Sequence, residues 1–159
     1  MTMTPEEKLT SLGLVLPPAP EPLAHYRPAR LVGNTLYLSG QMPRNADGSF
    51  ILGRLGSDAT ADEGYAAARN IGLQLLSVVK AAVGDLSRVA AVAKVTGMVN
   101  AEPDFLDHAS VINGCSDLLI DVLGEAGYHA RSAVGMGSLP FGVVVEIEAV
   151  LEIKPQDSE

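Results

Sequence analysis

The sequence has a single cysteine, few aromatic residues and no long apolar run. One cysteine cannot form a disulfide within the chain, and residues 1–7 lack the basic and apolar segments of a secretory signal. Glycine and charged residues interrupt every apolar stretch well before the roughly 20 residues that a membrane helix needs. These absences predict a cytoplasmic protein with no membrane association.

Positive charge is also scarce, because 11 Lys and Arg residues face 19 Asp and Glu residues, for a formal net charge of −8. The basic residues are scattered, so no Lys/Arg run can track a phosphate backbone, and few aromatic residues are present to stack on bases. The average field repels polyanions at long range. We therefore expect no nucleic-acid partner.

The residues that usually bind metals or act as nucleophiles are sparse. The three histidines lie at positions 25, 108 and 129, with no spacing that places two ligands on one helix face. Cys115 has no histidine close in sequence, which favours a small apolar residue in a helix over a nucleophile. Ser39-Gly40-Gln41 resembles neither a nucleophile elbow nor a phosphate loop. We expect no metal and no cofactor.

What is present is the composition of one packed domain, with 159 residues of which 47% are hydrophobic and 19% charged. We assign residues 1–159 to a single domain with an N-terminal extension at 1–22. Thr4 followed by Pro5 predicts a short helix over 5–12, with an N-cap residue and a proline at the first helical position. Four prolines between residues 17 and 22 predict an extended connector.

The remaining pattern predicts two long helices among strands. Residues 30–38 are typical of a hairpin around Gly33-Asn34, and residues 44–60 of a loop with one small strand at 50–52. Apolar spacing predicts a helix over 62–83, opened by a Thr60/Glu63 capping box and ended by Gly84. A buried strand follows at 89–99. A second helix is expected over 104–123, with a kink or a delayed start because Asn113-Gly114 lies within it.

Strict alternation marks the last strand, over 143–153. Its apolar residues share one face, while Glu146, Glu148 and Glu152 share the other, a pattern that a helix cannot produce. Two helices among five or six strands make α+β the predicted fold class.

Two charged residues allow both a structural and a functional interpretation. Arg131 opens the segment Arg131-Ser132-Ala133-Val134, where a surface or interface ion pair is favoured, although a guanidinium also fits a substrate carboxylate. Alternation alone favours a solvated face for Glu146, yet a glutamate in a cleft can hold and activate water. The residues by themselves leave both alternatives open.

Several segments, in order, resemble one known family. These are Tyr26, Gly33-Asn34, the run Leu38-Ser39-Gly40-Gln41-Met42-Pro43, and a final block running from Arg131-Ser132 through Leu139-Pro140 to Glu146-Ile147-Glu148-Ala149. They resemble the signature of the reactive intermediate deaminase (Rid, YjgF) family, and the spacing of the final block is its most specific part. The resemblance extends from about residue 20 to residue 153. The extra N-terminal segment and longer second helix resemble the longer subgroup labelled endoribonuclease L-PSP.

The resemblance implies a fold similar to the bacillus type of chorismate mutase, in which two helices cover one face of a mixed sheet. It also implies a homotrimer with clefts between subunits, and the apolar strands suit such a closed assembly. The implied activity is a hydrolase, a deaminase that converts 2-imino or 2-aminoacrylate-type acids to 2-keto acids and ammonia without a cofactor. Its partner would be a small carboxylate-bearing metabolite.

Carried over residue by residue, the resemblance implies that Arg131 clamps the carboxylate and Glu146 positions water. Tyr26, Ser39 and Gly40 would line the cleft, and Ala133 would offer its backbone N–H.

This chain departs from the family pattern at three places. His129 stands where the family often has proline, and Ala133 where it often has cysteine. Asn100 is the nearest match to an asparagine often seen after the central strand. A non-catalytic carboxylate-binding module is therefore the alternative function, while endoribonuclease and chorismate mutase activities are disfavoured.

Overall fold

The computed structural model describes residues 1–156. Three α-helices and five strands follow one another along these residues in this order: α1 (Pro5–Ser11), β1 (Ala29–Val32), β2 (Thr35–Gln41), α2 (Ala61–Val83), β3 (Val89–Asn100), α3 (His108–Leu123), β4 (Ala130–Met136) and β5 (Val145–Ile153). Short 3-10 turns at Leu86–Arg88, Gly124–Gly127 and Pro140–Gly142 connect some of them. The predicted α+β class is confirmed, as are the hairpin, both long helices and the buried strand.

The strands form one mixed sheet in the order β1-β2-β5-β3-β4. β3 and β4 are parallel, with Val95 opposite Arg131, and the other neighbours are antiparallel. Parallel neighbours need a crossover connection, which α3 supplies. β4 consequently forms one edge of the sheet, and Arg131 lies on that edge strand.

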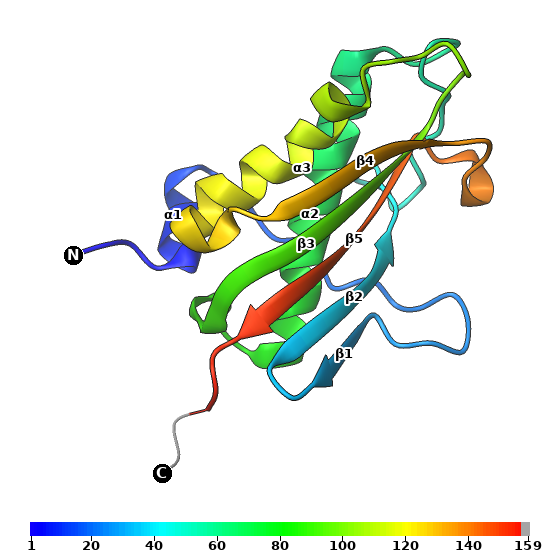
Figure 1. Ribbon diagram of the computed structural model, residues 1–159. Helices are drawn as coiled ribbons and strands as arrows, with labels where there is room; N and C mark the ends of the chain where they lie inside the picture. The colour runs from blue at the N-terminus through cyan, green and yellow to red at the C-terminus, as the bar shows by residue number, and fades with distance from the viewer. Residues whose placement is uncertain (157–159) are drawn as a thin grey trace.

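Helices α2 and α3 pack side by side on one face of this sheet (Figure 1). Val145, Ile147 and the other odd-numbered residues of β5 are buried beneath them, while Glu148 and Glu152 are exposed. The predicted alternation is confirmed. The face of the sheet that carries Glu146 is therefore the face without helices, here called the open face.

The sequence signals for the ends of α2 are confirmed. Thr60 accepts a hydrogen bond from the Glu63 amide, the Glu63 side chain accepts one from the Thr60 amide, and Gly84 with a φ of 87° ends the helix. α3 begins at His108 and continues without a break through Asn113 and Gly114, so the kink or delayed start expected there is wrong. Gly114 lies where α3 crosses α2, and a Cβ atom there would collide with the carbonyl oxygen of Tyr65. Close helix contact explains a glycine that lowers intrinsic helix propensity.

The N-terminal extension is held against the domain. The Ser77 hydroxyl of α2 donates to the Pro17 carbonyl at 2.6 Å, and the Leu86 amide donates to the Glu6 carboxylate at 2.9 Å. The connector between α1 and β1 thus begins at a fixed point on α2. The expected small strand at 50–52 is reduced to isolated bridges, Phe50 with Arg44 and Leu52 with Val143. None of the helices within residues 1–156 combines the length and apolar character that crossing a bilayer requires.

Candidate functional site

Arg131 lies on the helix-covered face of the sheet, at the rim where β4 meets α3. One guanidinium nitrogen, Nη1, donates to Asn113 Oδ1 at 2.8 Å and to Ser116 Oγ at 3.0 Å. Both acceptors are neutral side chains of α3. The guanidinium is thus held in place without any neutralisation of its charge.

A third residue, His129, supports this arrangement through Ser116. His129 Nδ1 lies 2.7 Å from the Gly127 carbonyl oxygen, and its Nε2 lies 2.9 Å from Ser116 Oγ. A carbonyl can only accept, so Nδ1 carries a proton, and in this tautomer Nε2 accepts from the Ser116 hydroxyl. That leaves a lone pair of Ser116 Oγ for Arg131. Arg131, Asn113, Ser116 and His129 are called the arginine cluster below.

The remaining donors of Arg131 are open. Within residues 1–156, its Nε and Nη2 make no hydrogen bond and no carboxylate lies within ion-pair distance. Nε–H and Nη2–H form the side of the guanidinium fork that binds two carboxylate oxygens in parallel. The favoured interpretation of Arg131 as an ion-pair partner finds no counter-charge within this part of the chain.

Cys115 lies near Arg131 but is inaccessible. It is fully buried in α3, and burial raises the pKa of its thiol to about 12, although the Arg131 charge acts in the opposite direction. A thiol with such a pKa stays protonated and is a poor nucleophile. The interpretation of Cys115 as a small apolar core residue is confirmed.

Ala133 shares the Arg131 face of β4, two residues further along. It lies opposite Gly97 of β3 and packs against the hydrophobic core. The Ala133 methyl group thus fills a position at the edge of the core where the family often has a cysteine. Ala133 and Arg131 therefore belong to the same side of the predicted cleft.

Glu146 lies on the open face, half-buried near the start of β5 and opposite Met98. Burial raises the pKa of its carboxyl group, and the like charge of Glu148 raises it further. Gly40 makes room for this side chain, because a Cβ atom there would lie 3.1 Å from the Glu146 carboxyl carbon. Glu146 makes no ion pair within residues 1–156.

Three predicted lining residues gather at the end of β2, near Glu146. Tyr26 and Gly40 line one small hollow. The Ser39 hydroxyl donates to the Arg27 carbonyl at 2.6 Å, which fixes the segment before β1. Tyr26, Ser39, Gly40 and Glu146 are called the glutamate cluster below.

A single chain does not bring the two clusters together. Arg131 projects toward α3 on the helix-covered face, whereas Glu146 projects from the open face. Residues on opposite faces of one sheet cannot contact the same small ligand directly. Any site that uses both must combine faces from different chains.

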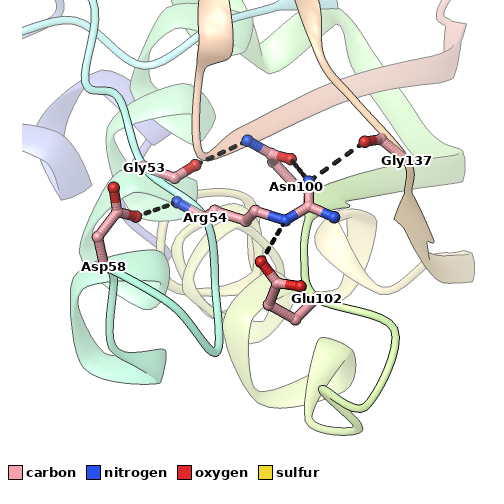
Figure 2. Close-up of polar contacts among 6 residues, drawn as sticks. All are labelled: Gly53, Arg54, Asp58, Asn100, Glu102 and Gly137. Carbon is pink, nitrogen blue, oxygen red and sulfur yellow. Dashed lines mark hydrogen bonds and ion pairs between the residues drawn. The ribbon is translucent and has the colours of Figure 1, made fainter.

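Asn100 makes no hydrogen bond with Arg131 and lies instead in a cluster around Arg54. Its side chain donates to the Gly53 carbonyl at 2.9 Å and accepts from Arg54 Nη1 at 2.8 Å, as Figure 2 shows. Arg54 also donates through Nε to Glu102 at 2.8 Å and through Nη1 to the Gly137 carbonyl at 3.2 Å. This Arg54 cluster ties together the loops that follow β2, β3 and β4.

Sequence reasoning missed the partners of Arg131. Asn113 had served only as a sign of helix weakness, and Ser116 and His129 lie 13 residues apart with a helix end between them. The unusual histidine two residues before Arg131 was the one available signal. Across residues 1–156, no three His, Cys, Asp or Glu side chains gather closely enough to hold a metal ion.

The comparisons with known proteins agree with one another. Residues 6–151 match the family described as "YjgF/chorismate mutase-like, putative endoribonuclease". The chain is 45% identical over 146 residues to protein TCP17 of Trypanosoma cruzi, covering 91% of each chain. It is 33% identical to a 2-iminobutanoate/2-iminopropanoate deaminase of Dermatophagoides farinae, covering 87% of this chain and 93% of the relative.

The fold has a close match among solved structures. A crystal structure described as a "putative endoribonuclease" from Shewanella oneidensis is 35% identical, with a TM-score of 0.91. The alignment covers 95% of this chain and 100% of the other. The shared architecture therefore extends over nearly the whole of both chains.

Proposed function

Because the chain belongs to the YjgF/chorismate mutase-like family, we propose that it hydrolyses reactive 2-imino or 2-aminoacrylate-type acids to 2-keto acids and ammonia. The observation that carries this proposal is the state of Arg131. Its guanidinium is fixed by neutral partners and keeps two parallel donors and its full charge for a ligand. A carboxylate is the partner that this fork fits best.

The proposed chemistry needs few groups. A 2-aminoacrylate takes a proton at its terminal carbon and becomes the protonated imine. Water then adds to the C=N carbon, and collapse of that adduct expels ammonia, releases the remaining hydroxyl proton and leaves the C=O of the keto acid. Glu146 would orient the water, take one of its protons and deliver it to the departing nitrogen. A carboxyl group whose pKa is raised by burial suits such a reversible transfer. No step requires a cofactor.

We further propose that the site is assembled between copies of the chain in a homotrimer. The two clusters lie on opposite faces of one sheet, and the open face carries no helices. A cyclic assembly would set the arginine cluster of one copy beside the glutamate cluster of the next. Light scattering tests this directly, since a stable monomer at micromolar concentration would contradict the shared site.

A second candidate function is a carboxylate-binding module without catalysis. The observation that favours it is that Glu146 has no hydrogen-bond partner within residues 1–156, so nothing there fixes its orientation toward a water.

RNA cleavage is not proposed, because a chain of net charge −8 offers no basic groove. We place the protein in the cytoplasm, where amino-acid metabolism generates such imines.

The decisive assay generates the imine in situ. An amino-acid oxidase converts alanine to 2-iminopropanoate, and release of ammonia and keto acid is followed with and without this protein. Acceleration above the spontaneous rate supports the deaminase. Carboxylate binding without acceleration would favour the binding module instead.

A further inference from the structure

A long groove extends between the N-terminal connector and the loop after β2. One wall is formed by residues 17–21 and Leu23, the other by residues 44–48, and Asn70 and Gln74 of α2 form the floor. Its volume is about 770 Å³. Small-molecule sites typically enclose about 300–1,000 Å³, so this groove has the size of a ligand site. It is called the connector groove below.

Both walls are fastened to α2. The connector is anchored where Ser77 Oγ donates to the Pro17 carbonyl. The loop wall is anchored twice through Asn70, which accepts from the Arg44 amide at 2.9 Å and donates to the Arg44 carbonyl at 3.0 Å. The groove is therefore a built feature of the fold, and a ligand would bind with little ordering cost.

The connector groove adjoins the small hollow beside the glutamate cluster. It shares residues 20, 21, 23 and 44 with the small hollow that Tyr26 and Gly40 line. Gly40 in turn contacts the Glu146 carboxyl group. A molecule whose reacting carbon lies at Glu146 could thus extend its far end past Tyr26 into the groove.

The groove walls favour an apolar occupant. Prolines 17, 18 and 20, together with Leu23, supply rigid apolar surface. The groove's cation, Arg44, is already engaged, because its guanidinium lies 4.4 Å from the centre of the Phe50 ring and donates to the Gly48 carbonyl. The groove therefore offers mainly apolar walls without a free cation, and its lining also carries the carboxylates of Glu21 and Asp47.

One polar atom in the floor has no partner. Gln74 donates through Nε2 to the Met42 carbonyl at 2.9 Å and to Asn70 Oδ1 at 2.8 Å, so both neighbours of that nitrogen are acceptors. This fixes the amide orientation and leaves Gln74 Oε1, which is buried, without a hydrogen bond among the described residues. Because this oxygen is buried, an occupant of the groove cannot reach it without a local shift of the floor.

We propose that the connector groove receives the side chain of the substrate, and that the preferred substrates are 2-imino acids with large, mainly apolar side chains. This inference rests on the proposed deaminase function and adds its substrate class. It also gives the N-terminal extension a role, because residues 17–23 form the wall that a domain beginning at β1 would lack. Small imino acids would leave the groove empty.

The test compares one small and two large substrates. Imines are generated in situ by an amino-acid oxidase from alanine, leucine and phenylalanine, and kcat/KM is measured for the wild type and two variants. Ala19→Trp narrows the groove from its connector wall. Ala24→Trp places the same bulk on the same connector, at an exposed residue outside the groove. Circular dichroism and light scattering confirm fold and assembly for each variant.

We expect the wild type to favour the two large imines, and Ala19→Trp to lower their kcat/KM by at least about tenfold while leaving the alanine-derived imine unchanged. Ala24→Trp should change neither. Equal effects of Ala19→Trp on all substrates, or none, would overturn the groove assignment while leaving the deaminase intact. Failure of the wild type to accelerate any of the three imines would overturn the deaminase, and the groove assignment with it.

Discussion

Arg131 and Arg54 are both held by hydrogen bonds, but among the described residues only Arg54 also pairs its charge with a carboxylate. Arg54 donates to a carboxylate, an amide oxygen and a carbonyl, and the Glu102 charge balances its own. Arg131 has two neutral acceptors on one nitrogen and no counter-charge within residues 1–156. An arginine with a paired charge stabilises the loops it joins. An arginine that is fixed through one nitrogen and keeps its other donors and its charge unpaired is prepared for a ligand.

Glu146 belongs with Arg131 in this comparison. It too carries a charge without a counter-charge in the described chain, and both burial and Glu148 raise its pKa. Stability is sacrificed at both positions, since an unpaired, partly desolvated charge is unfavourable. We therefore expect substitutions of the unpaired charges to alter activity and substitutions of the paired charges to alter stability.

The largest effect on turnover alone is expected for Glu146→Gln. The amide keeps the shape but cannot take a proton, so turnover of 2-iminopropanoate should fall by about 100-fold while carboxylate affinity changes little. Steady-state kinetics and calorimetric titration with a 2-keto acid separate the two quantities. Parallel losses of affinity and turnover would place Glu146 in binding rather than in water activation.

Arg54→Ala should show the opposite behaviour. The change leaves Oδ1 of the buried Asn100 without its donor and Glu102 without its counter-charge. We expect it to lower the free energy of unfolding by about 2 kcal/mol. Carboxylate affinity should stay within about threefold. Arg69→Ala is the matched control, because its 3.8 Å contact with Asp121 is too long for a hydrogen bond and should contribute less than about 1 kcal/mol. Equal denaturation curves for the two variants would remove the distinction.

Ser116→Ala tests how firmly Arg131 is fixed. The change removes one of its two acceptors and leaves His129 Nε2 without its partner, so carboxylate affinity should weaken by about three- to tenfold. Ser132→Ala, on the opposite face of β4 and bonded to Lys94 at 3.2 Å, should leave affinity unchanged. If the Ser132 variant binds as weakly as the Ser116 variant, the loss comes from β4 as a whole.

The smallest effect concerns pH. Glu146 would act as a carboxylate, so activity should fall as pH drops through its raised pKa. Glu148→Gln removes a like charge, which lowers the pKa of Glu146 and moves this acid limb of the kcat profile to lower pH. Because the folded-state pKa is raised, Glu146 disfavours folding increasingly as pH rises from its unfolded pKa through that value. An unmoved acid limb in the variant would assign it to another group.

Sequence patterns predicted the elements of this fold well because their causes are local. The Thr60/Glu63 capping box and the alternation of β5 depend only on neighbouring residues, and both are confirmed. The partners of Arg131 depend instead on the crossing of α3 over β4, which spacing along the chain does not encode. Asn100 shows the same limit, since its contacts with Arg54 and Gly53 join loops that lie far apart in the sequence.

The placement of Glu146 and Arg131 on opposite faces also required the structure. Alternation could put Glu146 on one side of β5, but it could not relate that side to β4. Pairing of β3 with both strands supplies the relation, because Val95 lies opposite Arg131 and Met98 opposite Glu146. An odd separation of three residues along β3 puts the two side chains on opposite faces.

The most direct measurement is calorimetric titration of a 2-keto acid into the wild type, Arg131→Ala, Arg131→Lys and Arg54→Ala, with unfolding and light scattering on the same samples. We expect Arg131→Ala to lose about 2–5 kcal/mol of binding free energy, roughly thirty-fold to a few thousand-fold in affinity. Its unfolding curve and its assembly should match those of the wild type. Arg131→Lys should recover little, because an ammonium lacks the planar fork, and Arg54→Ala should bind like the wild type. Unfolding or dissociation of Arg131→Ala, or affinity equal to the wild type, would contradict the claim that Arg131 is the ligand anchor.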